Sequence, residues 1–207
     1  MKPWLFDILA CPIDKHFPLK LYIFSFETEL DHFQKILNIY ERKEIDSIKE
    51  EKIIDIIKEG DQILVRDNII LERKPINSYL KHIVTSINEI KNINLDAVDN
   101  LIKKCFTIIT SNIKENITKA IESQNVNYFE NILPDIYFLN KIKMETEIRS
   151  GILFCTTCNR WYPIIDTIPQ MLPDEYRNER EDVEFLKNNK HLIDDKFINQ
   201  DLKPFNI

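Results

Sequence analysis

Three cysteines near the two ends of the chain have the chemistry of metal ligands. Cys155 and Cys158 form a CxxC pair, and Cys11 lies close to the start of the chain. A structural zinc ion takes four ligands in a tetrahedron, so the pair supplies half a site. Cys11 opens a Cys-Pro-Ile-Asp sequence, in which Asp14 stands where a second CxxC would carry its last cysteine. Since a carboxylate oxygen can also bind zinc, we expect Cys11, Asp14, Cys155 and Cys158 to form a zinc site.

Two alternatives to this ligand set remain open. His16 is a second candidate for the fourth ligand. Without a metal, the three cysteines would be a buried apolar trio, with Asp14 capping a turn and His16 on the surface. The knuckle backbone can be predicted whether or not a metal is bound. In a metal knuckle, the residue after the second cysteine often takes a positive φ. Asn159 tolerates that conformation better than other non-glycine residues.

A redox role for Cys155 and Cys158 would require a different local structure. In thioredoxin-like motifs the pair lies at the start of a helix, where the first thiol is acidified. Here Asn-Arg-Trp-Tyr-Pro follows the pair, and proline fits poorly in a young helix. Cys105 lies among periodic apolar residues, so we expect it in a core rather than at a site.

Residues 161–172 read as one apolar edge strand. Proline cannot donate to a central ladder, so Pro163 and Pro169 confine the strand to an edge. An apolar edge needs a cover, either from the protein's own helices or from a strand that a partner adds. The acidic segment 174–190, predicted to be helical, could provide part of that cover. The expected partner-binding residues are Tyr162, Ile164, Ile165, Ile168, Pro169, Met171 and Leu172.

The elements between the two cysteine-bearing ends are predicted to be mainly helical. Apolar residues recur at helical spacing over residues 29–59, 76–90, 95–123 and 127–144. We expect the first stretch to end at Gly60, Asn94 to be an N-cap and Pro134 to interrupt the last stretch. Residues 62–74 are rich in β-branched residues and predict either a short hairpin with a turn at Asp67-Asn68 or an extended link.

The predicted fold is therefore α+β, with two domains. Residues 1–26 and 145–207 would form one small antiparallel β-domain from both chain ends. Residues 27–144 would form a large inserted helical domain.

Composition narrows the classes of function. The chain has 207 residues, of which 43% are apolar, enough for a sizeable core. Its formal net charge is -6, and phosphate binding needs clustered Lys and Arg, so we expect no direct nucleic-acid contact. No apolar run approaches the roughly 18 residues of a membrane span, and the N-terminus lacks signal-peptide features, so we expect a cytoplasmic protein without a membrane partner. The chain also lacks a phosphate-binding glycine loop and the HExxH and GxSxG motifs, so we expect no catalysis.

Two segments resemble the tRNA methyltransferase 112 family. The first is Phe6-Asp7-Ile8-Leu9-Ala10-Cys11-Pro12. The second is Gly151-x-Leu153-x-Cys155-x-x-Cys158-x-Arg160-x-Tyr162-Pro163-Ile164-x-Asp166-x-Ile168-Pro169-x-Met171-Leu172. Family members are non-catalytic subunits that bind and activate S-adenosylmethionine-dependent methyltransferases acting on tRNA, rRNA and release factors.

The resemblance implies a zinc-ribbon-like domain that docks by adding a strand to the methyltransferase sheet, in a heterodimer where the partner alone binds S-adenosylmethionine. The run 164–172 occupies the docking position. The chain departs from the family pattern at Asp14 and in its long helical insertion. The second hypothesis is a nucleic-acid-binding zinc ribbon, which needs a basic face around Lys15, Lys20, Arg160 and Arg177. A thiol oxidoreductase is the third.

Overall fold

The chain folds into two compact units. A computed structural model describes residues 1–60, 62–123 and 128–207. Helices and strands both contribute, so the predicted α+β class is confirmed. Unit 1 contains Met1–Thr28, Asn92–Asp99 and Glu147–Ile207, and unit 2 contains Glu29–Lys91 and Asn100–Thr146. Within the described ranges, no helix is both long and apolar enough to cross a membrane.

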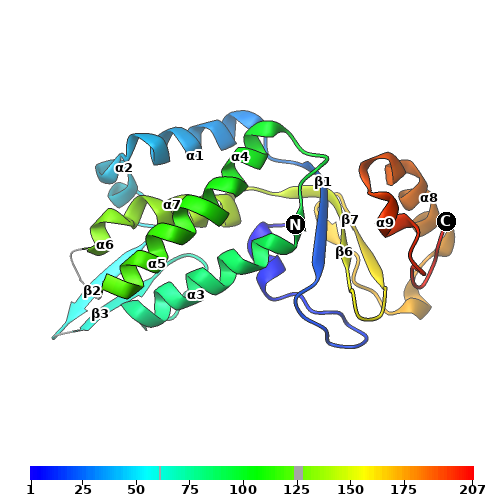
Figure 1. Ribbon diagram of the computed structural model, residues 1–207, viewed down its shortest axis with the longest axis horizontal. Coiled ribbons are helices and arrows are strands. Elements are labelled where there is room, and N and C mark those ends of the chain that lie inside the picture. The colour runs from blue at the N-terminus through cyan, green and yellow to red at the C-terminus, as the bar shows by residue number, and fades with distance from the viewer. Residues whose placement is uncertain (61, 124–127) are drawn as a thin grey trace. The chain divides into compact units, whose positions relative to one another are not determined.

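Unit 1 is built on a five-stranded sheet with the order β5-β1-β6-β7-β8 (Figure 1). Its strands are β1 (Lys20–Phe26), β5 (Ile93–Asn94), β6 (Ile148–Phe154), β7 (Trp161–Ile165) and β8 (Ile168–Pro169). All neighbours are antiparallel except β1 and β5, which are parallel. The register aligns Leu21 with Leu153 and Leu153 with Tyr162, so these three side chains share one face.

The opposite face of the sheet is covered by the C-terminal part of unit 1. It carries 3-10 helices η4 (Asp174–Tyr176) and η5 (Lys190–Leu192) and helices α8 (Glu179–Asn189) and α9 (Asp195–Ile198) (Figure 1). One buried cluster joins the sheet residues Tyr22, Phe24, Ile152, Phe154 and Trp161 to the C-terminal residues Leu186, Phe197 and Leu202. The predicted helix over 174–190 is therefore present as η4 and α8, and its apolar side faces the sheet.

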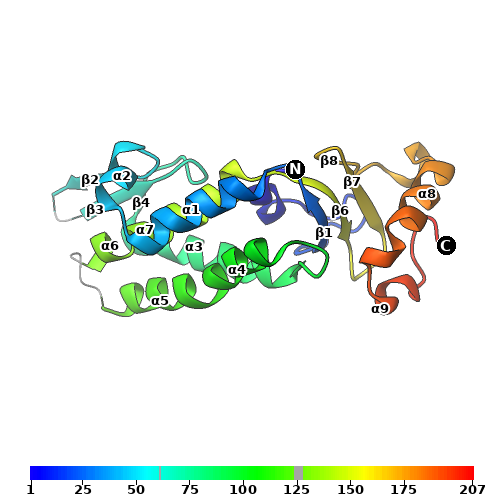
Figure 2. The ribbon, with the colours of Figure 1, turned by 90° about the horizontal axis from the view of Figure 1, so that it is seen from above.

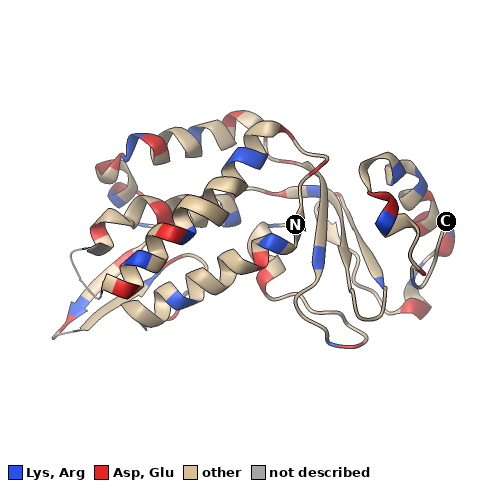
Figure 3. Ribbon diagram, viewed as in Figure 1, with Lys and Arg blue, Asp and Glu red and all other residues tan. Residues whose placement is uncertain are grey.

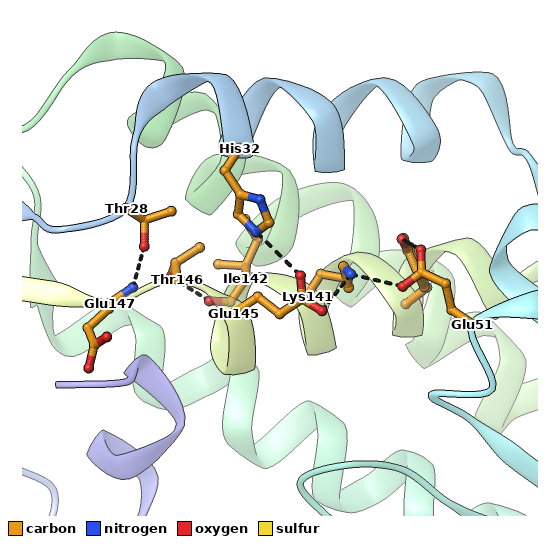
Figure 4. Close-up of polar contacts among 9 residues, drawn as sticks. Thr28, His32, Glu51, Lys141, Ile142, Glu145, Thr146 and Glu147 are labelled. Carbon is orange, nitrogen blue, oxygen red and sulfur yellow. Dashed lines mark hydrogen bonds and ion pairs between the residues drawn. The ribbon is translucent and has the colours of Figure 1, made fainter.

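The N-terminus of the chain is also fixed within unit 1. The short helix η1 (Pro3–Asp7) buries Phe6, and the terminal ammonium of Met1 donates to the carbonyl of Ile148 at 2.6 Å. The Thr28 hydroxyl accepts the N–H of Glu147 at 2.8 Å (Figure 4). The contact between Thr28 and Glu147 places the end of the first stretch of unit 1 beside the start of its last stretch.

Asn94 does not cap a helix as predicted. It lies in β5, which pairs Ile93 with Leu21, and the next helix begins at Asn100. The Asn94 carboxamide oxygen accepts the N–H of Asp96 at 3.0 Å, which is the local turn that asparagine commonly makes outside a helix start. Residues 92–99 consequently contribute a strand to unit 1.

Unit 2 contains most of the helices (Figure 2). They are α1 (Leu30–Arg42), α2 (Ile45–Glu50), α3 (Ile76–Glu89), α4 (Asn100–Ile108), α5 (Lys114–Ser123), α6 (Tyr128–Asn131) and α7 (Leu133–Glu145), with the 3-10 helix η2 (Ile90–Asn92) following α3. The stretch η3 (Ile109–Ile113) between α4 and α5 is π-helical. The helix predicted over 95–123 is therefore present only over 100–123, with this local irregularity, and residues 95–99 are not helical. Cys105 is buried in α4, as expected for a core residue. Pro134 lies in the first turn of α7, where a missing N–H costs nothing. Asn127, the first residue of the helix predicted over 127–144, lies outside the described residues.

The prediction of helix through residue 59 is wrong. Helix α2 ends at Glu50, and β2 (Asp55–Glu59) forms a hairpin with β3 (Gln62–Arg66). The isoleucines of this stretch satisfy helical periodicity, but β-branched residues pack equally well on a strand. Gly60, at φ +59°, begins the turn. The hairpin predicted over 62–74 is present as β3 and β4 (Lys74–Pro75), joined by a loop rather than a tight turn at Asp67.

Helix α7 is the centre of unit 2 and is buried along almost its whole length. Its polar side chains therefore need partners. Lys141 contacts Glu51 at 2.9 Å and Glu145 at 2.5 Å, and Glu145 lies 3.3 Å from the imidazole of His32 in α1 (Figure 4). These ion pairs connect α1, the end of α2 and α7.

Candidate functional site

Two short turns, residues 11–16 and 155–160, carry the predicted ligands, and we call them the knuckles. The backbone N–H of Cys11 donates to the carbonyl of His16 at 2.9 Å. The backbone N–H of Cys155 donates to the carbonyl of Arg160 at 2.8 Å. Each cysteine therefore opens a turn that closes on the fifth residue after it, and the two knuckles share one hydrogen-bond pattern.

The knuckles also share their one strained backbone position. Asn159 has φ +56°, as predicted, and Lys15 has φ +60°. Each follows the last ligand position of its knuckle, so Asp14 is the structural equivalent of Cys158. Lysine has no preference for this conformation, which costs a non-glycine residue roughly 1–2 kcal/mol. The turn geometry imposes it, and for that reason the sequence did not reveal it.

The four predicted ligands meet in space. Their ligand atoms all lie within 4.8 Å of one another, and Asp14 is the carboxylate in the group. The Sγ atoms of Cys11 and Cys158 are 3.7 Å apart, and the Cys155 Sγ lies 3.4 Å from an Asp14 oxygen. Two thiolates at about 2.3 Å from a tetrahedral zinc ion would be about 3.8 Å apart. The cluster therefore has the donor types and dimensions of a zinc site.

His16 does not belong to this cluster. Its Nε2 atom lies 3.4 Å from the Thr156 hydroxyl, while its backbone N–H donates to the Asp14 carboxylate at 3.0 Å. That hydrogen bond is the largest factor that lowers the pKa of Asp14 to about 2. Asp14 is thus held ionised and oriented, as a cation ligand must be.

The pKa values of the buried thiols shift in the opposite direction to that of Asp14. Burial raises the pKa of Cys11 and raises that of Cys155 to about 12. A thiol-disulfide catalyst needs a lowered pKa at the attacking cysteine. The residues after Cys158 form β7 instead of a helix, so a helix dipole does not acidify the pair. The local structure thus favours a structural metal site over redox catalysis.

Arg160, the last residue of the second knuckle, and Tyr162, two residues later, contact the cluster or anchor its neighbourhood. The buried Tyr162 hydroxyl lies 3.3 Å from the Cys11 Sγ. The Arg160 guanidinium forms a two-point ion pair with Asp174, with contacts of 2.9 to 3.1 Å, and the proximity of Asp174 and then Cys158 raises the pKa of Arg160. Sequence reasoning assigned Tyr162 to partner binding and missed its contact with a ligand, because that contact depends on how Cys11 meets β7.

Residues 161–172 do not form one strand, contrary to the prediction. β7 and β8 are the two arms of a hairpin whose turn residues, Asp166 and Thr167, both have positive φ values, 44° and 70°. Two consecutive positive φ values mark the tight turn that matches strand twist. The usual Asn-Gly signal is absent here, so the sequence pattern did not indicate the reversal.

The hairpin divides the predicted docking residues into two groups. Tyr162 and Ile164 on β7 are fully buried inside unit 1. Ile165, Ile168 and Leu172 are 39%, 59% and 42% exposed. Pro169 and Met171 are half-buried. The exposed apolar side chains therefore lie in residues 165–172, which comprise the end of β7, the turn and the outer arm. We call residues 165–172 the docking hairpin.

The first knuckle and its approach expose further apolar side chains that the sequence did not single out. Ile8, Ile13 and Phe17 are 64%, 43% and 42% exposed. The apolar residues of this N-terminal stretch have no regular spacing, so the sequence did not predict which of them are exposed. Ile8, Ile13 and Phe17 add to the apolar surface of unit 1.

Comparison with known proteins identifies one family. The family model described as Trm112p-like protein matches residues 2–166. That range contains both knuckles and ends in the turn of the docking hairpin, before β8. Neither the curated proteins nor the solved structures gave a match.

Proposed function

We propose that this chain, which belongs to the Trm112p-like protein family, is a non-catalytic subunit that binds and activates a methyltransferase. Family membership supports the general role of activator. The finer proposal is that the partner uses S-adenosylmethionine, binds that cofactor alone, and methylates tRNA, rRNA or a release factor. The chain would act in the cytoplasm as one half of a heterodimer.

The exposed apolar side of the docking hairpin is the observation that carries this proposal. Ile165 and Ile168, which pair across β7 and β8, and Leu172, which follows β8, present large apolar side chains to solvent. Apolar side chains held in one conformation bind a partner with little loss of entropy. The chain would stabilise the methyltransferase by covering an apolar surface of that enzyme and keeping its substrate and cofactor sites in shape.

A zinc ion would support this role from a distance. Cys11, Asp14, Cys155 and Cys158 would hold it, and it would supply structural cross-linking rather than catalysis. The ion would join knuckles that are far apart in sequence. β7 follows directly from the second knuckle, so the cross-link would fix the base of the docking hairpin.

A nucleic-acid-binding function is less well supported. The net charge is -6, and Figure 3 shows basic and acidic residues interspersed along the helices of unit 2. Two of the four residues expected on a basic face are neutralised, because Arg160 pairs with Asp174 and Arg177 with Asp182. We therefore propose that the partner, and not this chain, contacts RNA.

The proposal is tested by capture of the partner from native cell extract. We expect the tagged chain to retain an S-adenosylmethionine-dependent methyltransferase. The double variant Ile168→Asp with Leu172→Asp should bind the methyltransferase at least about 30-fold more weakly. A loss of this size is typical when a central interface residue is substituted. The far-UV spectrum and unfolding temperature should stay unchanged, because both side chains are exposed.

Leu71→Asp is the matched control, since Leu71 is an exposed leucine of unit 2, 73% accessible. This variant should capture the methyltransferase as well as the native chain does. The proposal fails if the native chain retains no methyltransferase, or if the double variant retains it equally well.

A further inference from the structure

The outer edge of β7 is paired with the C-terminal end of the same chain. The Trp161 N–H donates to the Lys203 carbonyl at 3.1 Å, and the Lys203 N–H donates to the Asn159 carbonyl at 2.9 Å. Lys203 and Arg160 form a parallel bridge. The first half of this edge therefore already has a strand partner.

The other outward groups of β7 are also satisfied. The Trp161 carbonyl accepts a hydrogen bond from the Arg177 guanidinium. Pro163 has no N–H, and its carbonyl accepts the N–H of Gln170 at 2.8 Å. A strand added to β7 would find the backbone groups of Trp161 and Pro163 occupied.

Side chains hold the C-terminal segment in this place. The Trp161 indole N–H donates to the Phe205 carbonyl at 3.0 Å. The Arg177 guanidinium lies 4.7 Å from the Trp161 ring centre and 6.0 Å from that of Phe205, and it pairs with Asp182 at 2.8 Å. Leu202 is 2% exposed and belongs to the cluster that covers the sheet face. The segment is packed into unit 1 rather than resting on it.

All of these contacts come from residues beyond the part of the chain that matches the family. The match ends at residue 166, whereas the contacts of Arg177, Lys203 and Phe205 with β7 come from residues 177–205. We infer that residues 174–207 act as a built-in partner of the sheet, which closes β7 and confines a docking methyltransferase to the outer arm of the hairpin. This inference rests on the proposed function for the identity of the partner. It also accounts for the protection of the edge of β7 in the free chain, because an open strand edge invites self-association.

The first experiment needs no partner. In the native chain the Trp161 amide should exchange with solvent slowly. In a chain that ends at Gln200, and in the milder variant Phe205→Ala, it should exchange at least tenfold faster, and the shortened chain should self-associate. Ile207→Ala is the control and should match the native chain. The inference is overturned if the Trp161 amide stays equally protected in both test variants.

The second experiment uses the methyltransferase that co-purifies with the native chain. Its affinity for Phe205→Ala and for the shortened chain should stay within twofold of the native value, and the Lys203 amide should remain protected in the native complex. A shortened chain that binds at least tenfold more tightly, or a Lys203 amide that opens on binding, would show that the segment competes with the partner. If no methyltransferase is captured at all, the proposed function fails, while the first experiment still decides whether the segment shields β7.

Discussion

Asp14 takes the ligand position in the first knuckle that Cys158 takes in the second. The replacement of a thiolate by a carboxylate makes the donor set harder, and zinc, a borderline ion, accepts both. The His16 backbone N–H orients the carboxylate and lowers its pKa to about 2. A single residue thus sets the composition of the candidate metal centre, while the two knuckles keep the same backbone.

Replacement of Asp14 should change zinc affinity in both directions. Asp14→Cys restores a softer ligand and should bind zinc at least tenfold more tightly, whereas Asp14→Ala should bind at least tenfold more weakly. Competition with a chromophoric chelator at constant pH measures both. His16→Ala should be neutral, and equal affinities of all the Asp14 variants would exclude Asp14 as a ligand.

A second informative residue is Asp135 in α7, which belongs to unit 2 and not to the candidate metal cluster. It is 3% exposed, and burial raises its pKa from 3.8 to about 6. Tyr40 and Asn116 donate hydrogen bonds to its carboxylate at 3.1 Å, and Lys43 favours its charged form. These partners reduce the cost of burial without removing it.

The raised pKa of Asp135 predicts a fall in stability with rising pH. Between about pH 4 and pH 6 the folded chain holds this proton more tightly than the unfolded chain, so the free energy of unfolding decreases as pH increases. Asp135→Asn removes the titration, and its stability relative to the native chain should rise by about 2–3 kcal/mol across this interval. Urea unfolding at pH 4, 5, 6 and 7 measures the difference. A constant difference at all four values would contradict the assignment.

At the scale of elements, the β6–β7–β8 ribbon decides which residues face solvent. A strand running straight from Trp161 to Leu172 would have alternated its side chains across both faces. The reversal at Asp166 and Thr167 instead places β7 in the interior and β8 at the rim. The side chains of Asp166 and Thr167 do not by themselves indicate where the turn lies. Contacts of the ribbon help to hold the turn, such as the hydrogen bond that the Thr167 N–H donates to the Arg149 carbonyl.

Gly151 in β6 is the residue on which the pairing of β1 and β6 depends. A Cβ atom added there would lie 2.4 Å from the backbone oxygen of Tyr22, which cannot rotate away. Gly151→Ala should therefore lower the free energy of unfolding by about 2–3 kcal/mol or more. Thermal and urea unfolding measure the loss.

Gly60, the other glycine of the chain, is the matched control. It has open space around its Cβ position but a φ of +59°, so Gly60→Ala should cost only about 1 kcal/mol of backbone strain. A smaller loss for Gly151→Ala than for Gly60→Ala would refute the close approach of β1 and β6.

At the scale of the whole molecule, unit 1 is assembled from three separate stretches of chain. The candidate metal ligands of the first stretch meet those of the third, and β5 comes from the second. Unit 2 has its own buried centre in α7 and contributes none of the described cluster of four ligands.

Removal of zinc should therefore destabilise unit 1 and leave unit 2 unchanged. Addition of a strong chelator to the zinc-loaded chain should accelerate amide exchange in residues 11–16 and 155–160. The amides of α7 should exchange at their original rate, because their protection comes from packing within unit 2. Mass-spectrometric exchange measures both regions in one sample. Equal acceleration in α7 would show that the metal stabilises the whole chain.

The sequence alone determined the ligand types, the α+β class and the helical character of most of unit 2, because these follow from side-chain chemistry and local periodicity. The positive φ of Asn159 was predictable for the same reason. Only the tertiary structure decided that Asp14, and not His16, joins the cysteines. It alone placed Tyr162 and Ile164 inside and brought Lys203 to the edge of β7. These outcomes depend on which distant segments meet, and neither periodicity nor spacing along the chain carries that information.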